Sequence, residues 1–382
     1  MFLRSLLGFW VSKLIMVSQS HLKPPKHDSD ALEEIAHLHY SSIPSTNDAR
    51  IHFCEFRASD KKMPISKRKV IIHAEGNINT YEQFTKEYIA KAKHFPDYTV
   101  AAFNFRNVGK STGKAYSEDD WIDDAITMVN YYRKKGILTE NILLNGHSLG
   151  GAILTMAAAK IYVQDKKKSK TPHTVKSVKI INNRSFSDLS EIFIKLYLNG
   201  RRKALVNSLV YTCLLAMFFT LPLAALLGSF ITLGSLIHDG FSHLLIKPWI
   251  SLSLWLTFGT MNALSAYQTL PEESKDYIVA KNDLNIGKKP SLHTGLKAAR
   301  RTKKTELLEQ MKEKSSDDRK KQELHSLFVN IKDCKLESTE GINEHLAPLS
   351  LLKTYHHHRP QPLTGEQVMD NKIKRLFKKS ST

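Results

Sequence analysis

The sequence contains little cysteine: Cys54, Cys213 and Cys334 are its three copies in 382 residues, and they form no C-x-x-C pair. This spacing argues against a disulfide scaffold and against a structural zinc site. Acidic residues are also few, with 37 Asp and Glu against 56 Lys and Arg, so the formal net charge is +19. Hydrophobic residues make up 42%, which excludes wholesale disorder and allows a chain of this length a sizeable core.

Short apolar runs alternate with helix patterns along much of the chain. The runs typical of strands lie at 49–56, 69–73, 98–103, 141–145, 177–181 and 277–281. A capping box that begins at Thr80 predicts a helix to about Lys93, Ser117 can cap a second helix, and 149–163 has the pattern of a third. Strands that alternate with helices predict a parallel sheet covered on both faces, and therefore an α/β domain.

The clearest chemical signal is Gly146-His147-Ser148-Leu149-Gly150-Gly151. The G-x-S-x-G pattern forms a nucleophile elbow when a strand precedes it and a helix follows it. The predicted strand 141–145 and helix 149–163 meet both conditions. Glycines are needed because the turn is tight and a side chain there would clash with the neighbouring strand or helix. Ser148 is therefore the candidate nucleophile.

From these residues the chain resembles the α/β-hydrolase superfamily. The sequence FNFRNVGKS at 103–111 is similar to the superfamily's turn D-x-R-G-x-G-x-S, and IHAEGN at 72–77 is similar to its turn after the third strand. The resemblance covers roughly 35–185 and 270–355. It implies the α/β-hydrolase fold, a mostly parallel sheet with helices on both faces and a lid insertion after the sixth strand.

A narrower resemblance is to a hydrolase-like family of intracellular bacterial pathogens of the Chlamydia and Legionella kind. It rests on Gly76-Asn77 followed by Tyr81-Glu82, and on NNRSFS at 182–187.

A serine nucleophile needs a base and an acid that orients the base, and in this superfamily the chain order is Ser, acid, His. Asp283 follows the predicted strand 277–281, where the acid is expected. The alternative interpretation is that Asp283 is an exposed loop residue without a catalytic role. His345 lies after a short predicted strand at 334–337 and before an apolar helix at 349–352, and it is the expected base. His293 is the alternative, although it follows Asp283 closely. The cluster at 356–358 is not expected to be catalytic.

The expected oxyanion hole consists of two backbone N–H groups. Leu149 provides one at the N-terminus of the helix after Ser148, where the helix dipole favours negative charge. The resemblance implies that the second comes from the Gly76–Asn77 turn, and Asn77 is the expected donor.

An apolar run without any charged residue extends over 204–237. It is longer than the roughly 20 residues that cross a bilayer as a helix, but Pro222 breaks it near the middle. It predicts a kinked span, two short re-entrant helices or an apolar lid, with membrane contact favoured. The segment 249–267 is also uncharged and rich in aromatic residues.

The N-terminal segment 1–17 is mostly apolar, but Lys13 interrupts it and no small-residue cleavage pattern follows. Two interpretations stay open. One is a short helix that lies in a membrane interface with Trp10 near the headgroups, and the other is a helix packed on the parent domain.

The predicted organisation has five parts. They are an apolar N-terminal segment and linker at 1–30, the first half of the hydrolase core at 35–185, a hydrophobic lid or membrane-contacting insertion at 186–270, the second half of the core at 271–355 with a charged helical insertion at 297–328, and a basic tail at 356–382.

The predicted function is a serine hydrolase of the esterase, lipase or thioesterase type, which cleaves an ester or thioester of a lipid or acylated substrate. The alternative is a membrane-associated scaffold or effector on a hydrolase fold without significant turnover. Neither a cofactor nor a metal is expected. The expected partners are an apolar acyl substrate and an anionic membrane surface, because basic residues flank the apolar segments.

Nucleic acid is not expected as a partner, since no recognition motif accompanies the lysines at 166–170. The expected location is a membrane, either in a host cell, as a secreted bacterial effector, or on the cytoplasmic face. Composition and motifs leave the substrate and the oligomeric state open.

Overall fold

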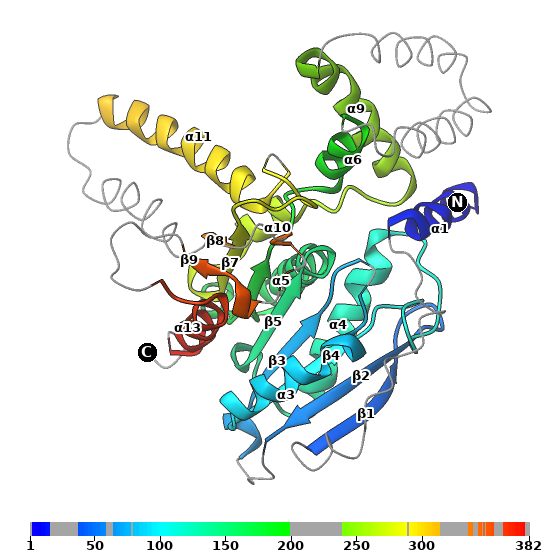
Figure 1. Ribbon diagram of the computed structural model, residues 1–382, viewed down its shortest axis with the longest axis vertical. Coiled ribbons are helices and arrows are strands. Elements are labelled where there is room, and N and C mark those ends of the chain that lie inside the picture. The colour runs from blue at the N-terminus through cyan, green and yellow to red at the C-terminus, as the bar shows by residue number, and fades with distance from the viewer. Residues whose placement is uncertain are drawn as a thin grey trace.

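The computed structural model describes most of the chain (Figure 1). The described residues are 2–15, 37–58, 64–77, 79–198, 239–288, 290–313, 335–338, 343–345, 347, 349–354 and 362–378. All structural statements below concern these ranges. The predicted apolar run 204–237 lies outside them, as do the histidines at 356–358 and the second half of the predicted charged insertion.

The strands within the described ranges form one nine-stranded sheet in the order β1-β2-β4-β3-β5-β6-β7-β8-β9. The strands are β1 (His37–Pro44), β2 (Arg50–Arg57), β3 (Lys69–Ala74), β4 (Tyr98–Phe103), β5 (Ile142–His147), β6 (Lys179–Asn183), β7 (Lys275–Ala280), β8 (Lys335–Glu337) and β9 (Lys353–Thr354). Strands β4, β3, β5, β6, β7 and β8 are parallel neighbours. Antiparallel pairs β1–β2, β2–β4 and β8–β9 form the two edges. The predicted strands agree with the observed ones to within two residues.

Helices cover both faces of this sheet, as predicted for an α/β domain. They are α1 (Phe2–Ile15), α3 (Thr85–His94), α4 (Glu118–Lys134), α5 (Leu149–Lys168), α6 (Leu189–Leu198), α9 (Asp239–Thr257), α10 (Ala263–Thr269), α11 (Leu292–Glu313) and α13 (Gly365–Lys378). Short 3₁₀ turns lie at Ile65–Lys67, Tyr81–Phe84, Thr139–Asn141, Pro172–Thr174, Glu272–Ser274 and Leu349–Leu351. The expected helix at 349–352 is therefore only a single turn.

The two faces are separated by the two-residue period of the strands. Along β3, Val70 and Ile72 pack into the cluster that contains α4 and α5, whereas Ile71 packs into the cluster that contains α13. Helix α3 covers the same face as α13, nearer to β2 and β4. The predicted caps are present. Thr80 forms a capping box at the start of the 3₁₀ turn Tyr81–Phe84, which leads into α3, and Ser117 forms one at the start of α4.

Three described helices lie between β6 and β7, in the predicted insertion: α6, α9 and α10. Helices α6 and α9 pack against each other, and α10 packs on α5. Their buried side chains, such as Phe193, Ile250 and Phe258, belong to the same core cluster as the α4–α5 face. In the described part of the chain, no helix is both long and apolar enough to cross a bilayer.

The N-terminal helix α1 packs on the parent domain, which was one of the two open interpretations. Val11 and Ile15 are buried in the main core cluster, and α1 contacts α9 (Figure 1). A side chain at Gly8 would overlap the carbonyl group of Tyr116, so only glycine allows this approach. Trp10 points away from the core and is 61% exposed.

The interpretation of 356–382 as a basic tail is wrong for residues 365–378. These residues form α13, an amphipathic helix whose apolar side chains cover the second core cluster on the sheet, namely Val368, Met369, Ile373, Leu376 and Phe377. The Lys372 ammonium donates to Asp276 Oδ1 on β7 at 2.8 Å, and Arg375 also pairs with Asp276. The positive charge is therefore used to attach the helix to the sheet, so this part of the chain belongs to the core.

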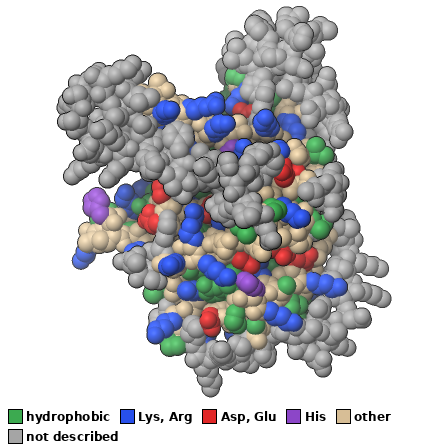
Figure 2. All heavy atoms as spheres, turned by 60° about the vertical axis from the view of Figure 1, so that its left-hand side comes forward, with side chains coloured by type: hydrophobic (Ala, Val, Ile, Leu, Met, Phe, Trp, Pro, Cys, Tyr) green, Lys and Arg blue, Asp and Glu red, His purple; other side chains and the backbone are tan. Residues whose placement is uncertain are grey.

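Several basic side chains are buried inside the protein. In addition to Lys372, they are Arg106, Lys179, Arg184 and Lys275. Arg106 is fully buried between Asp120 and Asp124, at 2.8 and 2.7 Å. On the face in Figure 2, exposed Lys and Arg side chains are dispersed among Asp and Glu instead of forming one basic stripe. Part of the +19 charge thus has an internal role.

Candidate active site

Strand β5 ends in a sharp turn at Ser148, and α5 begins at the next residue. Ser148 has φ 53° and ψ −121°, a backbone conformation that is strained for a residue with a side chain. A Cβ at Gly150 would lie 2.5 Å from the carbonyl oxygens of Ala74 and Glu75, and one at Gly146 would overlap Gly150. Both motif glycines are therefore required by close backbone contacts, and the predicted strand–turn–helix context of Ser148 is present.

The structure brings Ser148, Asp283 and His345 together. His345 Nε2 lies 2.9 Å from Ser148 Oγ, and His345 Nδ1 lies 2.8 Å from Asp283 Oδ2. All three side chains are buried. Because a carboxylate only accepts hydrogen bonds, Nδ1 carries the hydrogen, which leaves Nε2 free to accept from the serine hydroxyl. This is the geometry that makes a serine nucleophilic.

Asp283 follows β7 and is held in a turn of its own. Its Oδ1 accepts from the backbone N–H groups of Asn285 and Ile286, at 3.0 and 2.7 Å. Burial alone would raise the pKa of Asp283, but the hydrogen bond and charge of His345 and these two N–H groups bring the pKa below its ordinary value. The carboxylate therefore stays ionised beside the imidazole at neutral pH.

His293, the alternative base, lies elsewhere. His293 is in the first turn of α11, and its Nδ1 is 3.1 Å from the hydroxyl of Tyr277 on β7. Burial, reinforced by nearby Lys and Arg charges, lowers the pKa of His293 to about 4. The histidine that the structure places on Asp283 is His345.

The expected oxyanion donors lie beside the nucleophile. Leu149 is the first residue of α5, so its N–H is one of the unpaired donors at a helix N-terminus. The turn that contains Gly76 and Asn77 packs against Ser148, since a Cβ at Gly76 would lie 2.8 Å from Ser148 Cβ. Leu149 and the turn that contains Asn77 therefore adjoin Ser148, and their part in catalysis remains a prediction.

A model of the family described as the alpha/beta hydrolase fold matches residues 69–205. This match includes Ser148 and Asn77, and it agrees with the observed strand order and the nucleophile turn. The chain has the α/β-hydrolase fold.

The chain is also similar to solved structures that are named as hydrolases or esterases. One is an alpha-beta hydrolase from Vibrio vulnificus, with 16% identity, a TM-score of 0.44, and 72% of this chain and 76% of that chain covered. A Pyrococcus furiosus esterase has 14% identity, a TM-score of 0.38 and coverage of 68% and 74%. A Pyrobaculum calidifontis esterase has 17% identity, a TM-score of 0.31 and coverage of 50% and 61%.

These TM-scores are low, so the fold assignment rests on the strand order and the family model. No curated protein sequence matches the chain. The narrower resemblance to the Chlamydia and Legionella family stays a prediction.

Two residues that the motif analysis did not select hold the histidine loop of this hydrolase fold in place. Arg184 is the residue after β6, and its side chain is buried. Its Nη1 donates to the carbonyl oxygens of Glu344 and Ala347, at 2.8 and 2.7 Å. Its backbone has a φ of 51°, and burial lowers the pKa of Arg184 to about 10, against the charges of Asp283, Glu75 and Glu344. Arg184 thus fixes the loop on both sides of His345.

Glu344 connects the acid loop with the histidine loop. Its carboxylate accepts from the backbone and side-chain N–H groups of Asn282, at 2.6 and 3.2 Å, and from the backbone N–H of Ser338 at 2.8 Å. Asn282 precedes Asp283 and Glu344 precedes His345, so this carboxylate holds the two triad loops in register. The position of Glu344 immediately before His345 was the signal that could have identified it.

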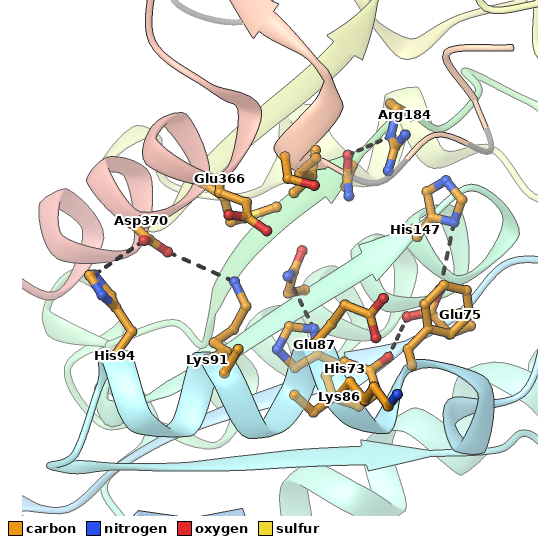
Figure 3. A pocket seen from close by; sticks show the side chains of 18 of the residues that line it. His73, Glu75, Lys86, Glu87, Lys91, His94, His147, Arg184, Glu366 and Asp370 are labelled. Carbon is orange, nitrogen blue, oxygen red and sulfur yellow. Dashed lines mark hydrogen bonds and ion pairs between the residues drawn. The ribbon is translucent and has the colours of Figure 1, made fainter. Parts of the chain in front are cut away.

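A cavity of about 660 Å³ lies behind the histidine loop, between α3 and α13 (Figure 3). Its lining includes His147 and Glu75 at one end and the Lys91–Asp370–His94 cluster at the other. Arg184 and Ala347 line it beside the triad, whereas Ser148 does not. The cavity therefore adjoins the groups that support His345. Within the described residues no group of His, Cys, Asp and Glu side chains could hold a metal ion.

Proposed function

We propose that the protein is a serine hydrolase that cleaves an ester or thioester through an acyl-enzyme. The observation that carries this proposal is the hydrogen-bonded chain Ser148–His345–Asp283, formed by loops that follow three strands of a hydrolase-fold sheet. Active sites of open α/β sheets lie at the carboxyl ends of the strands, where these loops meet. The family-model match supports a hydrolase.

The proposed chemistry follows from the position of the hydrogen on the His345 ring, at Nδ1, which leaves Nε2 as the base. Ser148 Oγ attacks the acyl carbonyl carbon while His345 Nε2 takes its proton, and Asp283 stabilises the imidazolium that forms. His345 then returns the proton to the leaving alcohol or thiol, which leaves an acyl group on Ser148. A water molecule attacks this acyl group, again with His345 as the base, and releases the acid and the free serine.

The negative oxygen of each tetrahedral intermediate requires N–H donors that are already oriented. We assign this part to the backbone N–H groups of Leu149 and Asn77. The closeness of Gly76 to Ser148 and the position of Leu149 at the start of α5 support the assignment. The dipole of the 20-residue helix α5 adds a favourable field at its N-terminus.

We further propose that the acyl group is apolar. Apolar side chains of the insertion between β6 and β7, among them Phe193 and Leu254, join the cluster that contains Leu149, the neighbour of the nucleophile. Sites for acyl chains are lined mainly by apolar side chains, so an insertion of this composition supports an acyl chain over a charged substrate. The preference for acyl chain length is measured as kcat/KM for p-nitrophenyl acetate, butyrate and octanoate. The value of kcat/KM should rise with chain length.

An anionic membrane surface is the proposed site of action. Trp10 on α1 and Trp255 on α9 are 61% and 62% exposed, and these two helices pack together. The Lys13 and Lys114 ammonium groups lie over the ring of Phe9, beside Trp10. Exposed tryptophans with adjacent lysines are typical of membrane interfaces. Co-sedimentation with phosphatidylserine vesicles that exceeds that with phosphatidylcholine vesicles is the expected result.

A fluorophosphonate probe tests the enzymatic proposal. The wild-type chain should be labelled, Ser148→Ala should not, and Ser185→Ala should be labelled as the wild type is, since Ser185 is a buried serine outside the triad. Equal labelling of wild type and Ser148→Ala contradicts the proposal. Hydrolysis of p-nitrophenyl esters then separates an enzyme from the alternative, a hydrolase-fold scaffold, which would show no turnover.

A further inference from the structure

The histidine of the nucleophile motif, His147, contacts the backbone of the proposed base. His147 Nε2 lies 3.0 Å from the carbonyl oxygen of His345, and the two imidazole rings are 4.9 Å apart between centroids at an angle of 35°. A carbonyl oxygen only accepts hydrogen bonds, so Nε2 must carry the hydrogen and donate it. The residue before the nucleophile thus holds the residue that activates the nucleophile.

The other edge of the His147 ring faces Glu75. Glu75 lies in the turn after β3, and its Oε2 is 3.6 Å from His147 Nδ1, longer than a hydrogen bond, as expected for two acceptor atoms. Its other oxygen, Oε1, accepts from the hydroxyl of Tyr88 on α3. Figure 3 shows His147 and Glu75 directed toward each other at one end of the cavity.

Burial, with the charge of Arg184, keeps the His147 ring neutral. Burial and the charge of Arg184 lower the pKa of His147 to about 4, against the opposing effect of Glu75. A neutral imidazole has one N–H, and the contact with His345 requires that hydrogen at Nε2. The protonation state and the geometry are therefore consistent with a single fixed donor.

We infer that His147 is a positioning residue that fixes His345, through its backbone carbonyl, at the distance from Ser148 that proton transfer needs. The inference rests on the proposed function, which it deepens. Arg184 already holds the carbonyl groups of Glu344 and Ala347, and His147 holds the carbonyl of His345, which lies between those two residues in the chain. The bond from the His147 side chain therefore holds the direction of the His345 carbonyl from the strand that carries the nucleophile.

Two nearly isosteric variants test the inference. His147→Gln keeps an N–H donor near the position of Nε2, whereas His147→Met removes it. His73→Met is the matched control, because His73 is another buried, neutral histidine of the sheet, and its ring contacts Asn145 and Tyr88 instead of the carbonyl of His345. Rates are measured with p-nitrophenyl acetate and normalised to the fraction of chains labelled by the fluorophosphonate probe, so that loss of folded protein does not count as loss of kcat.

The expected result is a fall in kcat of about 10- to 100-fold in His147→Met, with KM within about twofold, because a misplaced catalytic group lowers the rate without weakening binding. His147→Gln should recover most of this loss, and His73→Met should keep the wild-type kcat. The inference is overturned if kcat of His147→Met stays within about threefold of the control, or if the Gln and Met variants are equally slow.

A second measurement reads the contact in the wild-type protein itself. In nitrogen-15 spectra of histidine-labelled wild type, with His147 assigned from its loss in His147→Gln, the ring should be the neutral tautomer with hydrogen at Nε2 at pH 7. Hydrogen at Nδ1 overturns the inference, since Nε2 could not then donate. If wild type neither reacts with the probe nor hydrolyses esters, the proposed function fails, and the tautomer still decides whether the contact exists.

Discussion

His345 Nε2 lies 2.9 Å from Ser148 Oγ, although the two residues are 197 positions apart in the chain. The contact depends on two parallel strand ends: β5 delivers the serine, and the loop after β8 delivers the histidine. Both residues are buried, so their alignment depends on the loops that hold them. The predictions below concern those loops and the sheet beneath them.

Asp283→Asn should lower kcat by about 10⁴ with little change in KM, because an amide in place of the carboxylate favours the wrong imidazole tautomer and leaves the imidazolium unstabilised. Steady-state hydrolysis of p-nitrophenyl acetate measures this. Asp165→Asn, which removes a carboxylate from a partly exposed pair with Arg133, is the control and should keep the wild-type kcat. A variant Asp283→Asn with wild-type kcat would show that Asp283 is not the orienting acid.

Glu344→Ala should separate the two triad loops. It removes the acceptor of three N–H groups, from Asn282 and Ser338, so the free energy of unfolding should fall by about 1–3 kcal/mol. Because these bonds align Asp283 with His345, kcat should also fall by about 10- to 100-fold. The matched control is Glu337→Ala on β8, whose carboxylate forms a surface pair with Lys281. Chemical denaturation and ester hydrolysis measure both; equal effects of the two substitutions contradict the prediction.

The parts of the site that could be predicted are those encoded by local sequence. The Ser148 turn needs glycines because backbone atoms approach within contact distance, and that requirement appears as a five-residue motif. Asp283 and His345 followed from chain order and from the ends of late strands. Arg184 could not be selected this way, because its role depends on reaching the carbonyl groups of Glu344 and Ala347 from a different strand.

Helix α13 shows how a composition argument can mislead. Its four basic residues suggested a tail, yet Val368, Met369, Ile373, Leu376 and Phe377 recur at helical spacing on one face. The periodicity was present in the sequence and the charge obscured it. The sequence could not identify the acidic partner of Lys372. That partner is Asp276, a buried residue of β7 that is distant in the chain and meets Lys372 only in the folded protein.

The stability that Asp283 contributes should depend on pH in a defined direction. Its folded pKa lies below the ordinary value of about 3.9, so the unfolded state binds the proton more tightly. The contribution is then fully present above the unfolded pKa and is lost as the pH falls through the folded pKa. The difference in unfolding free energy between wild type and Asp283→Asn should therefore be constant above about pH 5 and decrease as the pH falls through about 3.9 and below. Urea denaturation at fixed ionic strength measures it, and a difference that grows toward low pH would contradict the sign.

Met369→Ala tests whether α13 is part of the core. Met369 is fully buried against the β-sheet in the cluster that also contains Leu143 and Ile278, so its truncation should lower the free energy of unfolding by about 2–5 kcal/mol through lost burial and an unfilled cavity. Val163→Ala on α5, where the side chain is 37% exposed, should change it by no more than about 0.5 kcal/mol. Chemical denaturation of both variants provides the comparison. If α13 were only an attached tail, it would unfold without affecting the main transition. The change in unfolding free energy of Met369→Ala would then equal that of Val163→Ala. The pairing of Lys372 with Asp276 and the continuous apolar face of α13 favour the larger effect.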